Sequence, residues 1–445
     1  MADPWGERMP RSVSLLQTIA VSVGITIGSG IFRVPATVAA ELQTPGMMLA
    51  CWALGGIVAL CGALTIAELA GALPRSGGIF AYLLESYGPL PAFLFGWTEL
   101  IVIRAAALGA IATIFAEYLG YFLPLTAAGV RDTAALAIVL VGAINYVGVQ
   151  RAAKLLGAAT ALKYVVLLAL GLLAFTAASA GIGRPTPAPT APVPVSMLAT
   201  ALIPVMWTYD GWADATAVAG EISNPQRNLP LGLIAGAACI TLVYLIVNLG
   251  FLHALTPAEM AGTKLVAASV AARIPLLHAG GVALVTAAVV LSAFSSLHAS
   301  MLTGSRIFFA MGDRGLLFQF VARVSPRFNT PSVAILLATV LGVTYVLQND
   351  FAQLADKFIL GIWPFYALTV AAVFVLRRRR PTLPRPYRVW GYPWVPLVFL
   401  AASAFMVLEA LRTQPYATGV TFAIILAGVP VFWLRARHAA RTHRA

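Results

Sequence analysis

The stretch VGITIGSGIF, residues 23–32, decides the fold of this chain. It lies inside an apolar run where an uninterrupted helix is expected, yet it contains Gly24, Gly28 and Gly30. Each glycine destabilises a helix by about 1 kcal/mol relative to alanine. A hydrophobic helix that is weakened so strongly at one point needs a physical reason.

The composition of the chain sets the surroundings of that helix. Of the 445 residues, 60% are hydrophobic and only 10% are charged, whereas a soluble domain carries about 25% charged residues. Only lipid can cover so much apolar surface, so we expect an all-α polytopic membrane protein. A transmembrane β-barrel would show alternating hydrophobicity, which is absent. No basic soluble module accompanies the net charge of +13, so membrane lipids rather than nucleic acids are the expected partners.

Twelve apolar runs are long enough to be membrane spans, since a helix crosses the hydrocarbon core with about 20 residues. The predicted spans are 14–39, 46–71, 91–119, 133–149, 155–180, 197–220, 230–252, 278–304, 331–348, 358–376, 393–412 and 416–434.

The distribution of basic residues predicts the orientation. An even number of spans places both termini on one side, and 20 of the 29 lysines and arginines fall on that side against six on the other. By the positive-inside rule both termini are cytoplasmic, and the protein is expected in the plasma (inner) membrane.

A second interruption matches the first. The sixth span contains PVMWTYDGWADATAVAGE, residues 204–221, in which Thr208, Tyr209, Asp210 and Gly211 fall at mid-membrane depth. The first and sixth spans are five spans apart, so the chain divides into two halves of opposite topology, each opening with an interrupted helix. This pattern is typical of an inverted-repeat transporter whose binding site lies at the breaks.

The chemistry of a broken helix favours a zwitterionic ligand. A break in lipid leaves backbone N–H and C=O groups unpaired, each at several kcal/mol. Freed N–H groups at a helix N-terminus face an anion, and freed carbonyls face a cation. An amino acid satisfies both sets. The alternative is that the glycines only allow close helix packing, as Gly24-x-x-x-Gly28 would permit.

Four motifs resemble the amino acid–polyamine–organocation superfamily, most closely its L-type amino acid transporter branch and bacterial relatives. They are GSGIF at 28–32 followed by Pro35, AELAGALPRSGGIFAYL at 67–83, WTYDGWADATAVAGEISNPQRNLP at 207–230, and SSLHASMLTGSRIFFAMGDRGLLF at 295–318 followed by NTPSVA. The resemblance covers residues 12–410.

The resemblance implies a LeuT-like 5+5 inverted repeat with discontinuous helices 1 and 6, plus two C-terminal helices. Residues 1–410 would form a single transporter core, and 413–445 would hold helix 12 and a basic cytoplasmic tail. Within the core, helices 1–5 would occupy 12–180, helices 6–10 would occupy 197–376, and helix 11 would occupy 393–412.

The resemblance also assigns a substrate site. Ser29, Gly30 and Ile31 would meet the substrate carboxylate, and the carbonyls of Thr26, Ile27 and Trp207 would meet its ammonium group. Trp207 would also be the aromatic gate that closes over the substrate; the alternative is an ordinary buried aromatic residue. The site is completed by Thr208, Tyr209, Asp210 and Gly211.

Lys163 is the predicted coupling residue. It lies eight residues into the fifth span, about 12 Å from its start, where a charged lysine costs about 2.5–3.5 kcal/mol. By resemblance it occupies the place of a sodium ion in sodium-driven relatives, so no metal is expected. Its ammonium group would join backbone carbonyls near Gly24 and Ile27 to the hydroxyls of Ser292, Ser295 or Ser296. The alternative is a purely structural lysine.

The predicted function is sodium-independent amino acid transport, by exchange or by proton coupling. The alternatives are a carrier of polyamines or other organic cations and, more remotely, a membrane-embedded enzyme. No cofactor is expected. Cys51, Cys61 and Cys239 all lie in apolar spans, and the external loop at 120–132 has no cysteine, so no disulfide-linked accessory subunit is expected.

Two ion pairs are predicted among the intramembrane charges. Glu68, near the cytoplasmic end of the second span, is expected to pair with a loop arginine. Glu99 and Arg104, five residues apart in the third span, are expected to pair with each other because a charge in lipid seeks a partner.

Overall fold

The structure is a computed structural model that describes residues 11–442 except 76, 149–162, 180–193, 314 and 316. The predicted start of the fifth span and the end of the predicted basic tail lie outside the described residues. The described residues form helices and no strand, with a single isolated parallel bridge between Val13 and Ile222.

The helices follow the apolar runs of the sequence. The elements that position the site and the membrane spans are α1 (Leu15–Thr26), η1 (Gly30–Phe32), α2 (Val34–Leu42), α3 (Pro45–Ala72), α4 (Gly78–Tyr87), α5 (Pro89–Thr98), the π-helix η2 (Glu99–Ile103), α6 (Arg104–Leu119), α7 (Ala127–Val147), an apolar helix over Lys163–Thr176, α9 (Val195–Tyr209), the 3₁₀-helix η4 (Asp214–Glu221), α10 (Pro225–Ala254), α11 (Pro257–Ala261), α12 (Val266–Arg273), α13 (His278–Asp313), α14 (Ser332–Gln348), α15 (Phe351–Arg379), α16 (Trp394–Thr413) and α17 (Pro415–Thr442).

Eight of the described helices are long and apolar enough to cross a membrane. They coincide with the second, third, fourth, seventh, eighth, tenth, eleventh and twelfth predicted spans. The other four predicted spans coincide with shorter apolar helices: Leu15–Thr26, Lys163–Thr176, Ser196–Tyr209 and Ser332–Gln348. The chain is thus an all-helical, multi-pass membrane protein.

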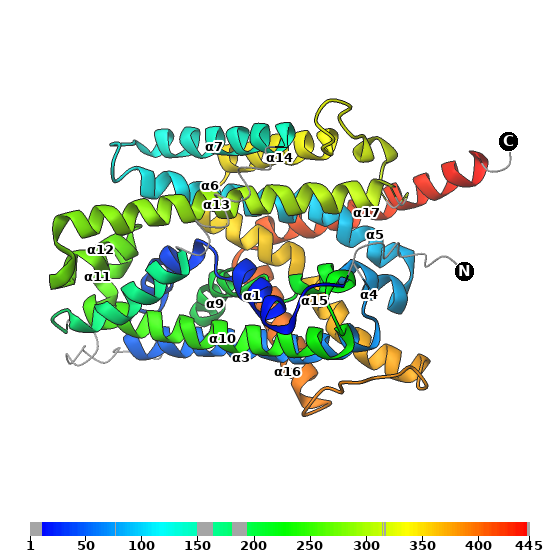
Figure 1. The fold of residues 1–445 in the computed structure, drawn as a ribbon, viewed down its shortest axis with the longest axis horizontal. Helices are drawn as coiled ribbons and strands as arrows, with labels where there is room; N and C mark the ends of the chain where they lie inside the picture. Colours follow the sequence, from blue (N-terminus) through cyan, green and yellow to red (C-terminus); the bar gives the residue numbers. More distant parts are fainter. Residues whose placement is uncertain are drawn as a thin grey trace.

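The two interrupted helices lie in the middle of the molecule. Figure 1 shows α7 and α14 side by side along one edge, α6 and α13 next to them, and α3 and α10 along the opposite side. Between these layers lie α1 and α9, which contact α10 and α3 respectively. A site built on their breaks is therefore enclosed by other helices.

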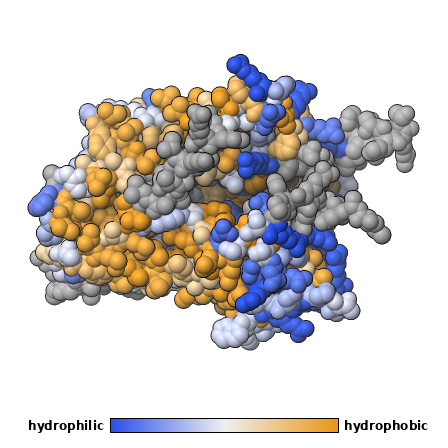
Figure 2. Space-filling view, viewed as in Figure 1, coloured by the Kyte–Doolittle hydropathy of each residue, from blue (hydrophilic) through white to orange (hydrophobic). Residues whose placement is uncertain are grey.

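The two ends of the helix bundle differ. The short helices α11 and α12 lie at one end, while α4 and the α15–α16 loop lie toward the other. Figure 2 shows hydrophobic residues over the flank of the helices and hydrophilic residues gathered toward the end that carries α4 and this loop.

Glycines let the central helices approach one another closely. A Cβ atom placed on Gly56 of α3 would collide with Thr241 of α10, and one on Gly236 of α10 would lie 2.7 Å from the Ser22 Cβ of α1. Small residues at such crossings are the usual way that helices pack in lipid, where no hydrophobic effect drives them together. The packing interpretation of glycines thus holds at these positions, which lie outside the two breaks.

Candidate binding site

The first interruption is a short non-helical segment inside a buried run. The helix α1 ends at Thr26, and a new helical turn begins only at Gly30. Ser29, Gly30 and Ile31 are all buried. The Ser29 Oγ atom has no hydrogen-bond partner, and the backbone hydrogen bonds of the described residues include none donated by the Ser29 N–H. The break therefore holds buried donors that a ligand could use.

The second interruption follows α9. The backbone of Asp210 is extended. Gly211 has φ +106°, a conformation that is accessible to glycine but strained for residues with a Cβ. The chain then continues as the 3₁₀-helix η4 instead of an α-helix. This difference from a regular span explains why the sixth apolar run yields only a short apolar helix.

The two breaks contact each other. A Cβ on Gly30 would lie 2.8 Å from the Trp207 ring and 2.9 Å from Thr208 Oγ1. A Cβ on Gly211 would lie 3.0 Å from Ile25 Cγ2 and 3.1 Å from the Thr26 backbone nitrogen. The sequence predicted both breaks separately, and the structure brings them together.

Tyr244 of α10 ties the ends of both broken helices, and sequence reasoning missed it. Its hydroxyl lies 3.1 Å from the Thr26 carbonyl oxygen and 3.0 Å from that of Thr208. A hydroxyl carries one proton, so it donates to one carbonyl at a time. The Thr26 carbonyl also accepts the Gly28 N–H at 2.7 Å. Of the carbonyls predicted to meet an ammonium group, that of Thr26 already has these partners, and that of Trp207 accepts the Asp210 N–H at 3.3 Å.

Tyr209 and Asp210 point to neighbouring helices. The Tyr209 hydroxyl donates to the Trp52 carbonyl of α3 at 3.1 Å, and its ring packs on Tyr244. Asp210 Oδ1 accepts a hydrogen bond from the Tyr366 hydroxyl of α15 at 2.7 Å. Tyr209 thus belongs to an aromatic cluster beside the break, whereas Asp210 links the break to α15.

Trp207 lies beneath a charged layer. Its ring packs edge-on against Phe351 of α15 with centroids 5.4 Å apart, and the Arg33 guanidinium lies 5.1 Å from the centroid of the same Phe351 ring. Arg33 Nε contacts Glu117 of α6 at 2.8 Å, and Lys264 approaches the other oxygen of Glu117 at 3.4 Å. This layer, on the side of α11 and α12, was not predicted. Its signal in the sequence was Arg33 itself, a charge one residue after the GSGIF motif.

The predicted coupling residues are buried or half-buried, and among the described residues no hydrogen bond joins Lys163 to the predicted serines or to α1. Lys163 is 4% exposed, and its Nζ lies 5.0 Å from the Tyr164 ring centroid. Within the described parts of the chain, Lys163 has no ion pair or hydrogen bond. Gly24 lies against the Tyr164 hydroxyl instead, since a Cβ there would be 3.2 Å away.

Of the α13 serines predicted to take part in coupling, one has a hydroxyl without a hydrogen-bond partner among the described residues. Ser292 Oγ is buried without a partner, while Ser295 Oγ donates to the Ser292 carbonyl at 2.9 Å. Ser296 is half-buried. The hydroxyls of Ser29 and Tyr164 are also buried without a hydrogen bond among the described residues. At the first break, and beside Gly24 of α1, buried hydroxyls are therefore unpaired within the described part of the chain.

Glu99 and Arg104 form the predicted ion pair, and the local helix geometry explains it. Residues 99–103 form a π-helix, in which the Arg104 N–H bonds the Glu99 carbonyl five residues back. This places the two side chains on one face, and they are in direct contact. Arg104 also donates to Ser300 Oγ at 3.0 Å, which joins α6 to α13.

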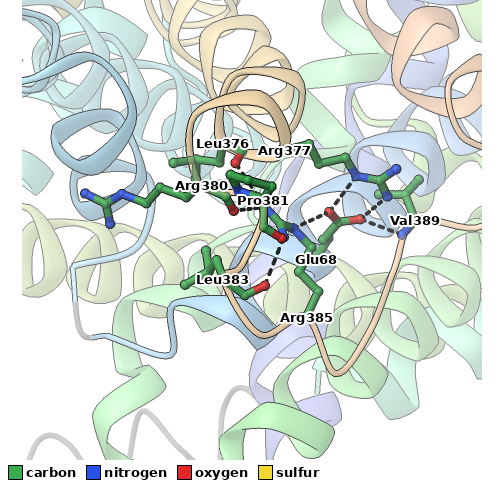
Figure 3. Close-up of polar contacts among 8 residues, drawn as sticks. All are labelled: Glu68, Leu376, Arg377, Arg380, Pro381, Leu383, Arg385 and Val389. Atoms are coloured by element: carbon green, nitrogen blue, oxygen red, sulfur yellow. Dashed lines mark hydrogen bonds and ion pairs between the residues drawn. The ribbon is translucent and has the colours of Figure 1, made fainter.

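Glu68 also pairs as predicted, with one partner more. Figure 3 shows its carboxylate between Arg377, in the last turn of α15, and Arg385, in the loop that follows. Arg377 donates to both carboxylate oxygens, at 2.8 and 2.6 Å, and the Val389 N–H donates at 2.7 Å. Removing one partner of a buried ion pair costs about 3–5 kcal/mol, so this cluster firmly holds the loop against α3.

The sequence of the whole chain identifies the class of protein. The amino acid permease family model matches residues 13–432. The chain therefore belongs to the amino acid permease family, within the amino acid–polyamine–organocation superfamily, and it is a membrane transporter and not an enzyme.

Similar proteins cover nearly the whole chain. The b(0,+)-type amino acid transporter 1 of Mus musculus is 30% identical over 96% of this chain and 88% of its own. The serine/threonine exchanger SteT of Bacillus subtilis (strain 168) is 30% identical over 96% of this chain and 97% of its own. The cystine/glutamate transporter of Homo sapiens is 29% identical over 96% of this chain and 85% of its own.

Proposed function

We propose that this protein is a secondary active transporter that moves L-amino acids across the plasma (inner) membrane by alternating access. The observation that carries the proposal is the contact between two interrupted helices at the middle of the molecule, with buried donors at the first break. The twelve-span, LeuT-like 5+5 arrangement, the single core over 1–410 and the cytoplasmic termini belong to the same proposal.

The proposed substrate contacts use backbone groups at both breaks. The carboxylate binds the N–H groups of Ser29, Gly30 and Ile31, where a helix N-terminus favours an anion. The ammonium group binds the carbonyls of Ile27 and Trp207, and that of Thr26 once Tyr244 turns to Thr208. The last step is possible because the Tyr244 hydroxyl reaches both carbonyls.

The proposed transport mode is sodium-independent, by exchange or by proton coupling through Lys163. The similar proteins are amino acid transporters, which supports amino acids as substrates, and one of them is an exchanger. We further propose that no disulfide-linked subunit is required. Cys51 and Cys61 are buried in α3, and Cys239 is exposed within the apolar helix α10, so none lies in an external loop.

The test is uptake into proteoliposomes that contain the purified protein. Vesicles empty or preloaded with amino acids are offered labelled amino acids and polyamines, with and without sodium and a pH gradient. Uptake that requires preloading identifies an exchanger, and uptake driven by the pH gradient identifies a proton-coupled carrier. Transport of polyamines alone, or uptake that requires sodium, overturns the proposal.

A further inference from the structure

The loop between α15 and α16 carries an unusual excess of positive charge. Residues 377–393 contain six arginines and no acidic residue. Two carboxylates face this segment: Glu68 contacts Arg377 and Arg385, and Glu85 contacts Arg380 at 2.8 Å. The local charge is therefore far from balanced by the protein itself.

Hydrogen bonds hold the loop in one conformation. The Val389 N–H is bound by Glu68, and Arg385 donates to the carbonyls of Leu376, Arg380 and Leu383 (Figure 3). These contacts use inward-facing groups of the loop. Its outward-facing groups are thus presented by a fixed backbone, which lowers the entropy lost when they bind a ligand.

Three arginines remain without a carboxylate partner. Arg378 and Arg388 are exposed and have no ion pair within the described parts of the chain, and Arg379 donates only to the Ser86 carbonyl, at 3.1 Å. These cations lie at the end of α15 and in the loop, at the hydrophilic end of the molecule shown in Figure 2.

Two exposed tryptophans follow Arg388 along the same segment of the chain. Trp390 in the loop is 77% exposed, and Trp394 at the first position of α16 is 73% exposed. Large exposed aromatic residues are costly in water but favourable at the level of lipid headgroups. Because α16 is long and apolar enough to span a membrane, its first residue is expected at the boundary between hydrocarbon and water.

We propose that this basic-aromatic loop, formed by Arg378, Arg379, Arg388, Trp390 and Trp394, is a docking surface for an anionic phospholipid headgroup. The arginines bind the phosphate oxygens, and the indole rings lie among the headgroups and upper acyl chains. Charge complementarity selects an anionic lipid over a zwitterionic one. The inference rests on the proposed cytoplasmic location of the loop and goes beyond transport, since none of these residues touches the candidate binding site.

The test measures lipid contact directly. Full-length protein is reconstituted in phosphatidylcholine vesicles that contain either brominated phosphatidylglycerol or brominated phosphatidylcholine, and tryptophan fluorescence is recorded. The contribution of Trp390 to the quenched fluorescence is the difference between wild type and Trp390→Phe. The contribution of Trp394 is obtained in the same way from Trp394→Phe. The expected result is stronger quenching of these contributions by the anionic lipid.

The arginine variants decide whether the preference comes from this surface. Arg378→Gln/Arg388→Gln is expected to weaken the phosphatidylglycerol preference by about fivefold for each arginine removed. The control Arg131→Gln, an exposed arginine in the first turns of α7, leaves it unchanged. Equal quenching by both lipids in wild type, or an unchanged preference in the double variant, overturns the proposal.

Two further arms separate the alternatives. Inorganic phosphate at constant ionic strength is expected not to remove the preference; if it does, the surface binds free phosphate and the lipid proposal is wrong. Amino acid uptake is measured on the same vesicles. Lost lipid preference with normal uptake overturns this inference alone, whereas absent uptake with intact lipid preference overturns only the proposed function.

Discussion

Gly30 has no space for a side chain, because its Cβ position lies against both Trp207 and Thr208. Gly30→Val is expected to weaken amino acid binding by about 5- to 150-fold, because overpacking costs about 1–3 kcal/mol. Binding is measured by calorimetry on purified protein. Gly46→Val is the matched control, since a Cβ there meets nothing within 4 Å. Equal affinities of Gly30→Val and Gly46→Val for the amino acid would show that the first break is not part of the binding site.

Lys163 is buried, and among the described residues its ammonium group has no ion pair or hydrogen bond and lies 5.0 Å from the centroid of the Tyr164 ring. If it couples transport to protonation, Lys163→Ala folds but loses most uptake, whereas wild-type uptake is unchanged when sodium is replaced. Initial rates between pH 5 and 9 are the measurement, with Lys357→Ala as the control lysine variant. Undiminished uptake by Lys163→Ala across that range contradicts the coupling role.

At the scale of elements, Glu117 joins α6 to the segment after the first break and to the α11–α12 region. Its side chain is 5% exposed and Arg33 is 12% exposed, so the pair is largely buried. Glu117→Gln is expected to lower the free energy of unfolding by about 3 kcal/mol, because it leaves Arg33 buried without its partner. Thermal unfolding in detergent measures the change.

A surface pair provides the comparison for this variant. The side chains of Arg273 and Glu259 are 49% and 38% exposed, and such exposed pairs contribute only about 0–1 kcal/mol. Arg273→Gln should therefore change stability much less than Glu117→Gln. The exchange Arg33→Glu/Glu117→Arg should recover part of the loss. Similar losses in both single variants would show that the Arg33 pair is not a special contact.

The short helix α11 predicts a pH dependence. Glu259 accepts the Thr256 N–H at 2.8 Å and contacts Arg273, and these interactions, the backbone hydrogen bond first, lower the pKa of Glu259 from its usual 4.5. A lowered folded-state pKa stabilises the fold above the ordinary value, and this contribution fades as the pH falls through the folded value. Glu259→Gln should therefore be less stable than wild type at pH 7, and the difference should shrink as the pH falls below 4.5, as measured by thermal unfolding. A pH-independent difference contradicts this.

At the scale of the whole molecule, the two ends of the bundle predict an orientation. Lys264 lies beside α12 at one end, and Arg388 lies in the basic loop at the other. In right-side-out vesicles, a membrane-impermeant maleimide should label Lys264→Cys and not Arg388→Cys, in a background where Cys51, Cys61 and Cys239 are serine. Labelling of Arg388→Cys but not of Lys264→Cys would show that the orientation is opposite to the proposed one.

The sequence predicted the elements better than their contacts. Apolar runs and glycines indicated the positions of helices and both breaks, because span length and helix propensity are local properties. The pairing of Glu99 with Arg104 was predictable for the same reason. The roles of Tyr244 and Phe351 were not, since an aromatic residue in an apolar run looks like core until its neighbours from other helices are known. Arg33 was visible as an isolated charge, but its partner lies 84 residues away.

The eight-residue 3₁₀-helix η4 is longer than an α-helix with the same number of residues would be. A 3₁₀-helix rises about 2.0 Å per residue and an α-helix about 1.5 Å, so rewinding η4 as α-helix would shorten it by about 4 Å. The backbone carbonyl of its last residue, Glu221, accepts a hydrogen bond from the Val13 N–H at 2.9 Å. The Ser223 N–H in turn donates to the Val13 carbonyl at 2.9 Å. Shortening of η4 would consequently draw the chain before α1 along with it. A change in the winding of η4, after the second break, would therefore move α1, which carries the first break. This coupling would need no contact with the substrate.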